Sequence, residues 1–182
     1  MKVRNLLNMQ VISSKNKKFL GLIHDICIKD HCIKYLILSF GGLFSKAQFI
    51  IPSDIVDIDY DHLEIESEKE MHKISAKEMK IQVAETYSII NLPVNDIEGN
   101  RFAKVADATI SNNLKEVLEY DLSRSFFDDL DYGYSLVSAD QLFFKENVLV
   151  YNDEMFAIKK TNREGGILQK ILGEDHDESI TR

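Results

Sequence analysis

The sequence contains no tryptophan, two prolines and two cysteines, Cys27 and Cys32, in 182 residues. Two cysteines cannot form a framework of disulfides, which excludes the class of small disulfide-stapled secreted domains and agrees with a reducing compartment. No apolar run approaches the roughly 18 residues that a membrane-spanning helix needs. Residues 1–8 become polar too soon for a signal peptide. We therefore expect a soluble, cytoplasmic protein.

The net charge of −8 is distributed unevenly along the chain. Residues 1–66 contain eight basic and eight acidic residues, whereas residues 86–153 contain five basic and twelve acidic ones. A protein that binds nucleic acid directly usually presents a basic face, because phosphate neutralisation dominates its affinity. The acidic second part argues against direct nucleic-acid binding. A small basic cluster, Lys15, Lys17 and Lys18, lies in a predicted loop of the first part.

A nine-residue stretch at residues 20–28 recurs at residues 102–110. Each copy contains an aspartate, Asp25 or Asp107, with an apolar residue two positions before it and another three positions after it. This recurrence predicts that one small domain is written twice. Each domain would have about 65 residues, a size that is marginally stable alone, so we expect the two to pack against each other.

A change in composition separates the two copies. Between them the chain is rich in Glu, Lys, Met and Ala, and Ser75 with Glu78 three positions later is a capping box that predicts a short helix. The expected boundaries are residues 1–66 for the first unit, 67–85 for a helical linker, 86–153 for the second unit, and 154–182 for a partly disordered tail.

Short apolar runs separated by turn residues predict strands in both units. The pairs Asp30-His31 and Asn112-Asn113 fall at corresponding hairpin turns. Residues 32–40 are apolar on both alternating faces at their centre, which is typical of a strand covered on both sides. The expected fold is mostly β, with two tandem small antiparallel β-barrels joined by the short helical linker.

Three motifs of the first unit together resemble the PRC-barrel domain family. They are an apolar-Gly-x-apolar-x-Asp pattern with Gly21 and Asp25, a Ser-Phe-Gly-Gly end with Gly41 and Gly42, and an Ile-Pro-x-x-x-Val segment with Pro52. The family includes barrel domains of the photosynthetic reaction centre H subunit and of the ribosome maturation factor RimM. The resemblance covers residues 1–66 well and residues 86–153 more weakly, and it suggests a bacterial tandem PRC-barrel protein.

The resemblance implies a six-stranded antiparallel barrel per unit and no catalytic residues, since the family acts in scaffolding and in protein or ribosome contacts. The second unit departs from the pattern. It has Ala103 in place of Gly21 and lacks counterparts of Gly41, Gly42 and Pro52. The repeated aspartates are interpreted as structural groups that accept backbone N–H bonds.

Two clusters of polar residues in the first unit suggest a metal site or a catalytic site, and neither has the pattern that such a site needs. Cys27, Asp30, His31 and Cys32 are close in sequence and would suggest zinc, but a closed zinc site usually has four ligands in paired spacings, and there is no second Cys pair. His24 next to Asp25 would suggest a catalytic dyad, but adjacent strand residues point to opposite faces. We therefore expect no catalytic residues, no metal and no cofactor.

Further motifs give no stronger site. The loop with Asp128, Asp129 and Asp131 lacks the regular ligand spacing of a calcium loop. Its neighbours Phe126 and Phe127 would either plug the barrel end or contact a partner.

The sequence therefore favours a non-enzymatic protein-binding adaptor or scaffold. Exposed apolar loop tips are typical of partner sites, and the expected contacts are Leu43, Phe44, Phe126 and Phe127. The alternative is a ribosome- or RNA-processing-associated factor analogous to the RimM barrel, with a ribosomal protein as its partner. The sequence leaves open whether the protein forms a homodimer.

Overall fold

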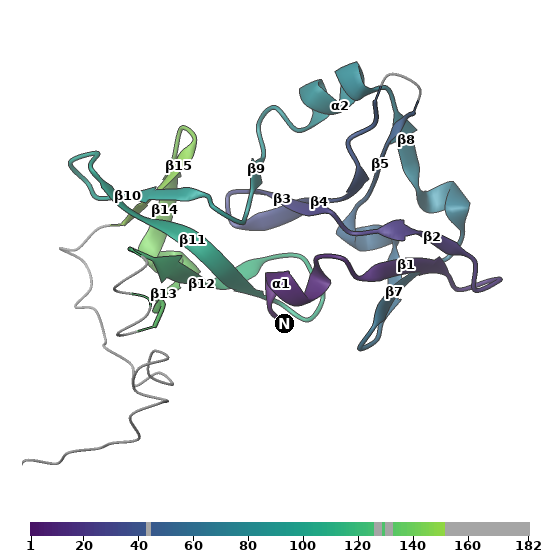
Figure 1. The fold of residues 1–182 in the computed structure, drawn as a ribbon, viewed down its shortest axis with the longest axis horizontal. Coiled ribbons are helices and arrows are strands. Elements are labelled where there is room, and N and C mark those ends of the chain that lie inside the picture. The colour runs from purple at the N-terminus through teal and green to yellow at the C-terminus, as the bar shows by residue number, and fades with distance from the viewer. Residues whose placement is uncertain (43–44, 126–128, 130–132, 152–182) are drawn as a thin grey trace, which may run out of the picture.

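A computed structural model describes residues 1–42, 45–125, 129 and 133–151 of the chain (Figure 1). Fifteen short strands make the described part mostly β, and no helix in it is both long and apolar enough to span a membrane. The predicted partner contacts Leu43, Phe44, Phe126 and Phe127, and the predicted tail, lie outside the described residues.

A four-stranded sheet contains the first and last strands of the first unit. Its strands are β1 (Gln10–Ser13), β2 (Phe19–Leu22), β6 (Ile55–Ile58) and β7 (His62–Ile65). They lie in the order β2-β1-β7-β6. A short helix, α1 (Val3–Leu6), precedes β1 and was not predicted. Four residues are too few for a helical period to stand out in a sequence.

A five-stranded sheet combines the middle of the first unit with strands from outside it. Its strands are β3 (Asp25–Lys29), β4 (Cys32–Ser39), β5 (Ala47–Ile50), β8 (His72–Ile74) and β9 (Tyr87–Ser88). They lie in the order β8-β5-β4-β3-β9. The edge strand β8 comes from the predicted linker, and the edge strand β9 comes from the start of the second unit.

A six-stranded sheet contains the rest of the second unit, in the order β13-β12-β11-β10-β15-β14. Its strands are β10 (Pro93–Asn95), β11 (Arg101–Ile110), β12 (Val117–Ser123), β13 (Ser135–Ser138), β14 (Leu142–Lys145) and β15 (Val148–Tyr151). The first unit has the same order, β5-β4-β3 followed by β2-β1-β7-β6. The long strand β11 corresponds to β2 and β3, which are separated at residues 23–24.

The prediction of purely antiparallel barrels is wrong, because each unit contains one parallel pair, β1 with β7 and β10 with β15. Parallel neighbours need a long crossover connection. In each unit the intervening strands provide it before the last strand returns beside the first. Within the described residues, no ladder joins β5 to β6 or β13 to β14, and the 3-10 turns η1 (Pro52–Asp54) and η3 (Ala139–Gln141) connect them instead.

The predicted linker helix is present as α2 (Ala76–Gln82), and its capping box is confirmed. The Glu78 amide donates to Ser75 Oγ at 3.2 Å, and the Ser75 amide donates to Glu78 Oε2 at 2.7 Å. Met79 is buried in one hydrophobic cluster with Ile37 of β4. Strand β4 is therefore covered on both faces at its centre, as predicted, since Leu36 belongs to the main core.

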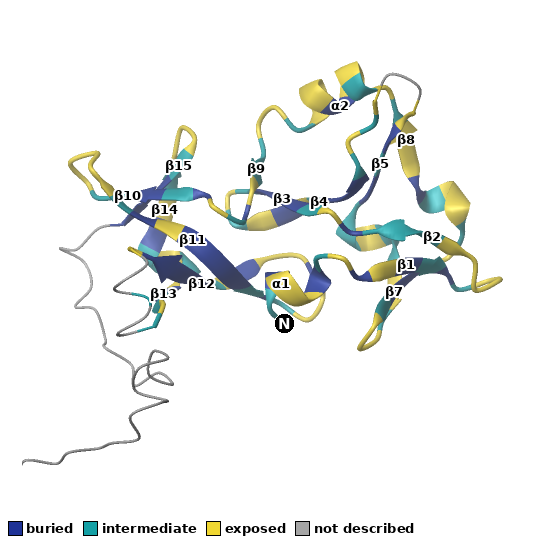
Figure 2. Ribbon diagram, viewed as in Figure 1, coloured by how far each residue is buried: buried dark blue, intermediate teal, exposed yellow. Residues whose placement is uncertain are grey.

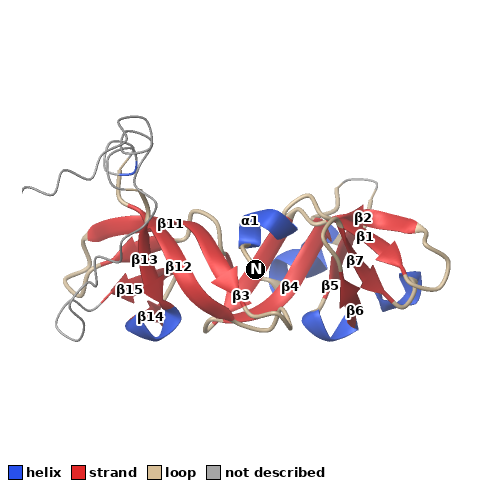
Figure 3. Ribbon diagram, turned by 90° about the horizontal axis from the view of Figure 1, so that it is seen from below, coloured by secondary structure: helices blue, strands red, loops and turns tan. Residues whose placement is uncertain are grey.

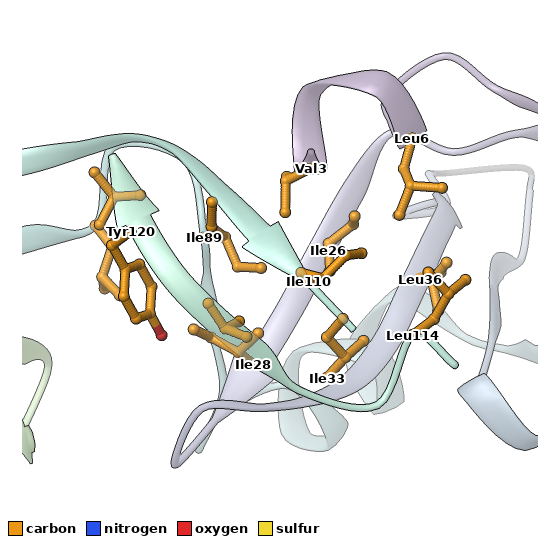
Figure 4. Packing of buried hydrophobic residues seen from close by; sticks show 14 of the residues in the cluster. Val3, Leu6, Ile26, Ile28, Ile33, Leu36, Ile89, Ile110, Leu114 and Tyr120 are labelled. Carbon is orange, nitrogen blue, oxygen red and sulfur yellow. The ribbon is translucent and has the colours of Figure 1, made fainter. Parts of the chain in front are cut away.

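The two units share one hydrophobic core, as expected from their small size. A single cluster of buried residues contains Ile26, Ile28, Ile33 and Leu36 of the first unit and Ile89, Ile110, Leu114 and Tyr120 of the second (Figure 4). Buried segments follow β3, β4 and β11 through the middle of the molecule (Figure 2). The view in Figure 3 shows these strands meeting at the centre of an elongated body, with α1 beside them.

Candidate functional site

The hairpin tips of the two units bind each other at the centre of the molecule. The Ile33 amide donates to the carbonyl oxygen of Lys115 at 2.8 Å, and the Val117 amide donates to that of His31 at 2.8 Å. We call this contact between the β3–β4 and β11–β12 hairpins the inter-unit junction. Backbone hydrogen bonds fix its register, so the two units form one body.

His31 occupies the middle of the inter-unit junction. Its Nδ1 lies 2.9 Å from the Tyr120 hydroxyl, its Nε2 lies 3.0 Å from the carbonyl oxygen of Leu142, and its ring centroid lies 5.0 Å from that of Phe144. Burial lowers the pKa of His31, which favours the neutral ring. A carbonyl only accepts hydrogen bonds, so the neutral ring donates from Nε2 to Leu142 and accepts the Tyr120 hydroxyl proton at Nδ1.

The first repeated aspartate links β3 to the start of the second unit. Asp25 Oδ1 accepts the Ile26 amide at 2.8 Å and the Ser88 hydroxyl at 2.7 Å. Beside it, the Ile89 amide donates to the carbonyl oxygen of Ile26 at 3.2 Å. Burial raises the pKa of the Asp25 carboxyl group, and its hydrogen bonds to Ser88 and Ile26 oppose this rise.

The second repeated aspartate makes the reciprocal link. Asp107 Oδ1 accepts the Ala108 amide at 2.8 Å and the Arg4 amide, from α1 of the first unit, at 3.1 Å. The amino group of Met1 donates to the carbonyl oxygen of Ile110 at 3.0 Å. Each aspartate thus accepts one bond from its own strand and one from the leading segment of the other unit, which supports the structural interpretation of both.

Two glycines of the predicted motif lie where a side chain would be crowded. Gly41 has a φ of +74°, and a Cβ atom there would lie 2.5 Å from the backbone nitrogen of Ala47. A Cβ atom on Gly21 would lie 3.0 Å from Cδ2 of Leu38. The second unit has Ala103 at the position of Gly21, so the packing of the two units differs there.

The other two motif residues flank β5. A Cβ atom on Gly42 would meet Ser45 Oγ at an ordinary contact distance of 3.5 Å. Pro52 begins the turn η1, in which the Ile51 amide donates to Asp54 Oδ2 at 2.9 Å. Pro52 thus stands at the first position of a turn, which suits its fixed φ and missing N–H.

The residues weighed as zinc ligands do not assemble. Cys27 is buried and Cys32 is exposed, and both His31 ring nitrogens have protein partners. Burial raises the pKa of the Cys27 thiol to about 12, so it remains protonated at neutral pH. Within the described residues, three candidate ligands come together only at the end of β6 and the start of β7, where Asp59, Asp61 and His62 lie near the surface.

His24 and Asp25, which the sequence does not favour as a catalytic dyad, do not contact each other through a hydrogen bond or ion pair. His24 is exposed, whereas Asp25 is half-buried and bonded to Ser88 and to its own strand. The described residues thus assemble no His–Asp pair at this position.

The basic cluster of the first unit is neutralised by acidic neighbours. Lys15 pairs with Glu66, Lys17 with Glu64, and Lys18 with Glu68, at N–O distances of 2.5, 2.6 and 2.7 Å. Ion pairing removes the excess positive charge that phosphate binding needs. This loop is therefore a poor candidate for a nucleic-acid interface.

Exposed aromatic side chains flank the two loops predicted to contact a partner. Phe40, which is 50% exposed, precedes the β4–β5 loop, and Tyr134, which is 43% exposed, ends the β12–β13 loop. We call the surface of these two loops the candidate partner surface. Phe40 and Tyr134 are its aromatic residues within the described part of the chain. The β6–β7 turn presents another aromatic residue, Tyr60, which is 96% exposed.

The sequence did not identify His31 as the centre of the inter-unit junction. The sequence offered one local signal, the turn-compatible pair Asp30-His31 between two β-prone runs, and in the structure both residues adopt positive φ, at 49° and 60°. A polar tip predicts a turn. Nothing local predicts that the ring points into another unit 89 positions along the chain.

Comparison with known proteins agrees with the resemblance in the first unit. Residues 1–72 match the family model of the PRC-barrel domain. A search of curated proteins gives no match. The matched segment contains β1 to β7 and the Gly21, Asp25, Gly41, Gly42 and Pro52 motif. The match to the PRC-barrel domain family therefore covers the whole first unit and the start of the linker.

Proposed function

We propose that the chain is a non-enzymatic adaptor or scaffold built from two PRC-type barrels, the second at residues 86–153. A repeated local conformation supports the second barrel. Asn8 and Asn91 have φ values of 67° and 66°. Their amides donate to the carbonyl oxygens of Ile23 and Val105, at 2.7 and 2.9 Å. The two asparagines thus turn the chain in the same way before β1 and before β10.

The turns η1 and η3 support the same proposal. In η1 the Ile51 amide bonds to the Asp54 side chain, and in η3 the Ser138 amide bonds to the Gln141 side chain at 3.1 Å. Both turns precede the strand that pairs with the last strand of the unit. Two units with one strand order and the same capped turn are best explained as copies of one module.

The candidate partner surface is the observation that supports the adaptor role most directly. Phe40 and Tyr134 are half-exposed aromatic residues on corresponding loops of the two units. The shared core holds these loops on one body. Aromatic residues on loops of a rigid scaffold are typical of protein-binding sites. Cys27 and Cys32 are both free thiols, which favours action in the reducing cytoplasm.

Association with the ribosome or with RNA processing remains the alternative proposal. It has less support, because Lys15, Lys17 and Lys18 are paired with glutamates. A basic ribosomal protein would still suit the acidic second unit, and such a contact would weaken strongly with salt.

Affinity capture from a lysate of the source organism tests the proposal. The full chain is compared with a Phe40→Asp/Tyr134→Asp variant, with and without nuclease, and the bound proteins are identified by mass spectrometry. We expect at least one protein that binds the full chain after nuclease treatment and is lost from the variant.

A Tyr60→Asp variant is the matched control, because it introduces the same charge at an aromatic residue outside the candidate surface. It should retain the captured protein. Loss of the protein from this control alone would contradict the proposed surface, and capture of ribosomal proteins that nuclease abolishes would favour the alternative.

A further inference from the structure

A pocket of about 530 Å³ over the start of β11 gathers four cationic side chains, those of Arg4, Arg101, Lys104 and Arg124. The second unit has five basic residues and a net charge of −7, and three of the five line this pocket. Arg4 is the fourth, and it comes from α1 of the first unit. Most of the basic residues of the acidic second unit thus lie around this one pocket.

The structure holds two of the four cations in position. Arg4 Nε donates to the carbonyl oxygen of Ala106 at 2.9 Å. The guanidinium of Arg124 lies over the ring of Phe102, 4.5 Å from its centroid. These contacts direct both side chains to the pocket without neutralising their charge.

The four cations form no ion pair with any described residue, whereas five lysines of the first unit and the linker pair with glutamates. Among the described residues that line the pocket, one is acidic, Asp129, whose Oδ2 accepts the Ser123 hydroxyl at 2.5 Å. Several like charges around one concavity create a positive potential that attracts carboxylates or phosphates. Arginine in particular donates paired N–H bonds to such oxyanions.

We infer that this pocket binds the acidic segment at residues 174–178 of the same chain. That segment, Glu-Asp-His-Asp-Glu, has four carboxylates in five residues. Tyr151, the last described residue, stacks on Phe102 with ring centroids 5.6 Å apart, and Phe102 lines the pocket. The described part of the chain therefore ends beside the pocket.

The length of the intervening chain permits this contact. Residues 152–173 separate Tyr151 from the acidic segment and can span at most about 75 Å, which exceeds any distance within the pocket. Ion pairs at exposed side chains are individually weak and are screened by salt. Tethering raises the effective concentration of the segment to the order of millimolar, so weak pairs suffice. This inference concerns an intramolecular contact and does not require the adaptor proposal, although Tyr134 of the candidate partner surface also lines this pocket.

The experiment measures binding of a fluorescent peptide of residues 172–180 by anisotropy at low salt. The proteins are the full chain and a chain that ends at Gly173. We expect the shortened chain to bind the peptide at least tenfold more tightly, because its own segment no longer competes. The affinity should fall at least tenfold between 50 and 300 mM salt. A peptide with Gln and Asn in place of the four acidic residues should not bind.

Two double variants of the shortened chain locate the site. Arg101→Glu/Lys104→Glu reverses charge in the pocket and should abolish peptide binding. Lys115→Glu/Lys145→Glu makes the same change in net charge at the other two basic residues of the second unit, which lie outside the pocket, and should bind as before. All four side chains are exposed, and circular dichroism checks that both variants fold.

Three results would overturn the inference. They are equal affinity of the full and shortened chains, equal loss of binding in both double variants, and saturable binding of inorganic phosphate in the pocket without binding of the peptide.

Discussion

His31 Nδ1 and the Tyr120 hydroxyl oxygen lie 2.9 Å apart, although 89 positions separate the two residues in the chain. His31 belongs to the hairpin tip of the first unit, and Tyr120 belongs to β12 of the second. Tyr120 is completely buried, so its hydroxyl needs a partner inside the protein. A turn of one unit therefore completes the core of the other.

Replacing His31 should destabilise the whole molecule. His31→Ala removes the partner of a buried hydroxyl and two ring contacts, and we expect a loss of about 1–3 kcal/mol in the free energy of unfolding. Urea denaturation measures the loss. His24→Ala is the control, since His24 is exposed, and it should change the midpoint little. In a double-mutant cycle, Tyr120→Phe should cost less in the His31→Ala background than in the wild type, and strictly additive costs would contradict the contact.

Stability should also depend on pH through His31. Burial lowers its folded-state pKa below the ordinary value of 6.5, while Asp30 and the bond to Leu142 oppose that effect. The unfolded chain therefore binds more protons, and the free energy of unfolding falls as the pH drops below about 6.5. The slope can be at most about 1.4 kcal/mol per pH unit.

Comparison with a His31→Gln variant isolates this effect. His62 has a raised pKa because Asp61 and Glu64 bond to it, but it is present in both proteins and cancels in the difference. The stability advantage of the wild type over the variant should shrink between pH 7.5 and pH 5. An advantage that grows on acidification would show that His31 is preferentially protonated in the folded state.

Replacing either repeated aspartate should destabilise the protein more than replacing an aspartate that accepts only a local hydrogen bond. Asp25→Ala and Asp107→Ala each remove two accepted hydrogen bonds, one of them from the other unit, and should each cost about 1–3 kcal/mol. Asp57→Ala is the matched control, because Asp57 also accepts the amide of the next residue, Ile58, but is exposed. Thermal or urea unfolding compares the three variants. Equal costs for all three would mean that the bonds between units contribute nothing.

Gly41 should tolerate a side chain less well than Gly99. Both have positive φ, +74° and +92°, so alanine brings backbone strain of about 1 kcal/mol at either position. At Gly41 the new Cβ atom would also meet the backbone nitrogen of Ala47 at 2.5 Å, whereas nothing lies within 4 Å at Gly99. We expect Gly41→Ala to cost at least 1 kcal/mol more than Gly99→Ala in urea denaturation. Similar costs would indicate that strain alone accounts for both.

Local patterns in the sequence predicted local structure well. The capping box at Ser75 and Glu78 predicted α2, and the apolar centre of residues 32–40 predicted a strand covered on both faces. Both features depend on residues a few positions apart, whose chemistry is visible in the sequence. The Gly21 and Asp25 motif likewise predicted the family whose model matches residues 1–72.

Features that depend on distant contacts were not predictable in the same way. The parallel pairing of β1 with β7 follows from how the chain returns after the other strands, and no residue in either strand specifies it. The role of His31 depends on the position of Tyr120 in another unit. The cationic pocket combines Arg4 with residues about 100 positions later. The net charge of −7 over residues 86–153 therefore gave no indication of a local cluster of basic side chains.

The contacts of each unit with the first residues of the other unit suggest how such a chain could arise. Residues 1–6 lie against β11 and residues 87–89 lie against β3, so each unit binds the segment that precedes the first strand of the other unit (its entry segment). A solitary ancestral barrel would leave its own entry segment without a binding site, and two identical copies could satisfy each other by reciprocal swapping. In that history, gene duplication and fusion would have turned a swapped homodimer into one polypeptide, with α2 and its flanking residues as the added connection.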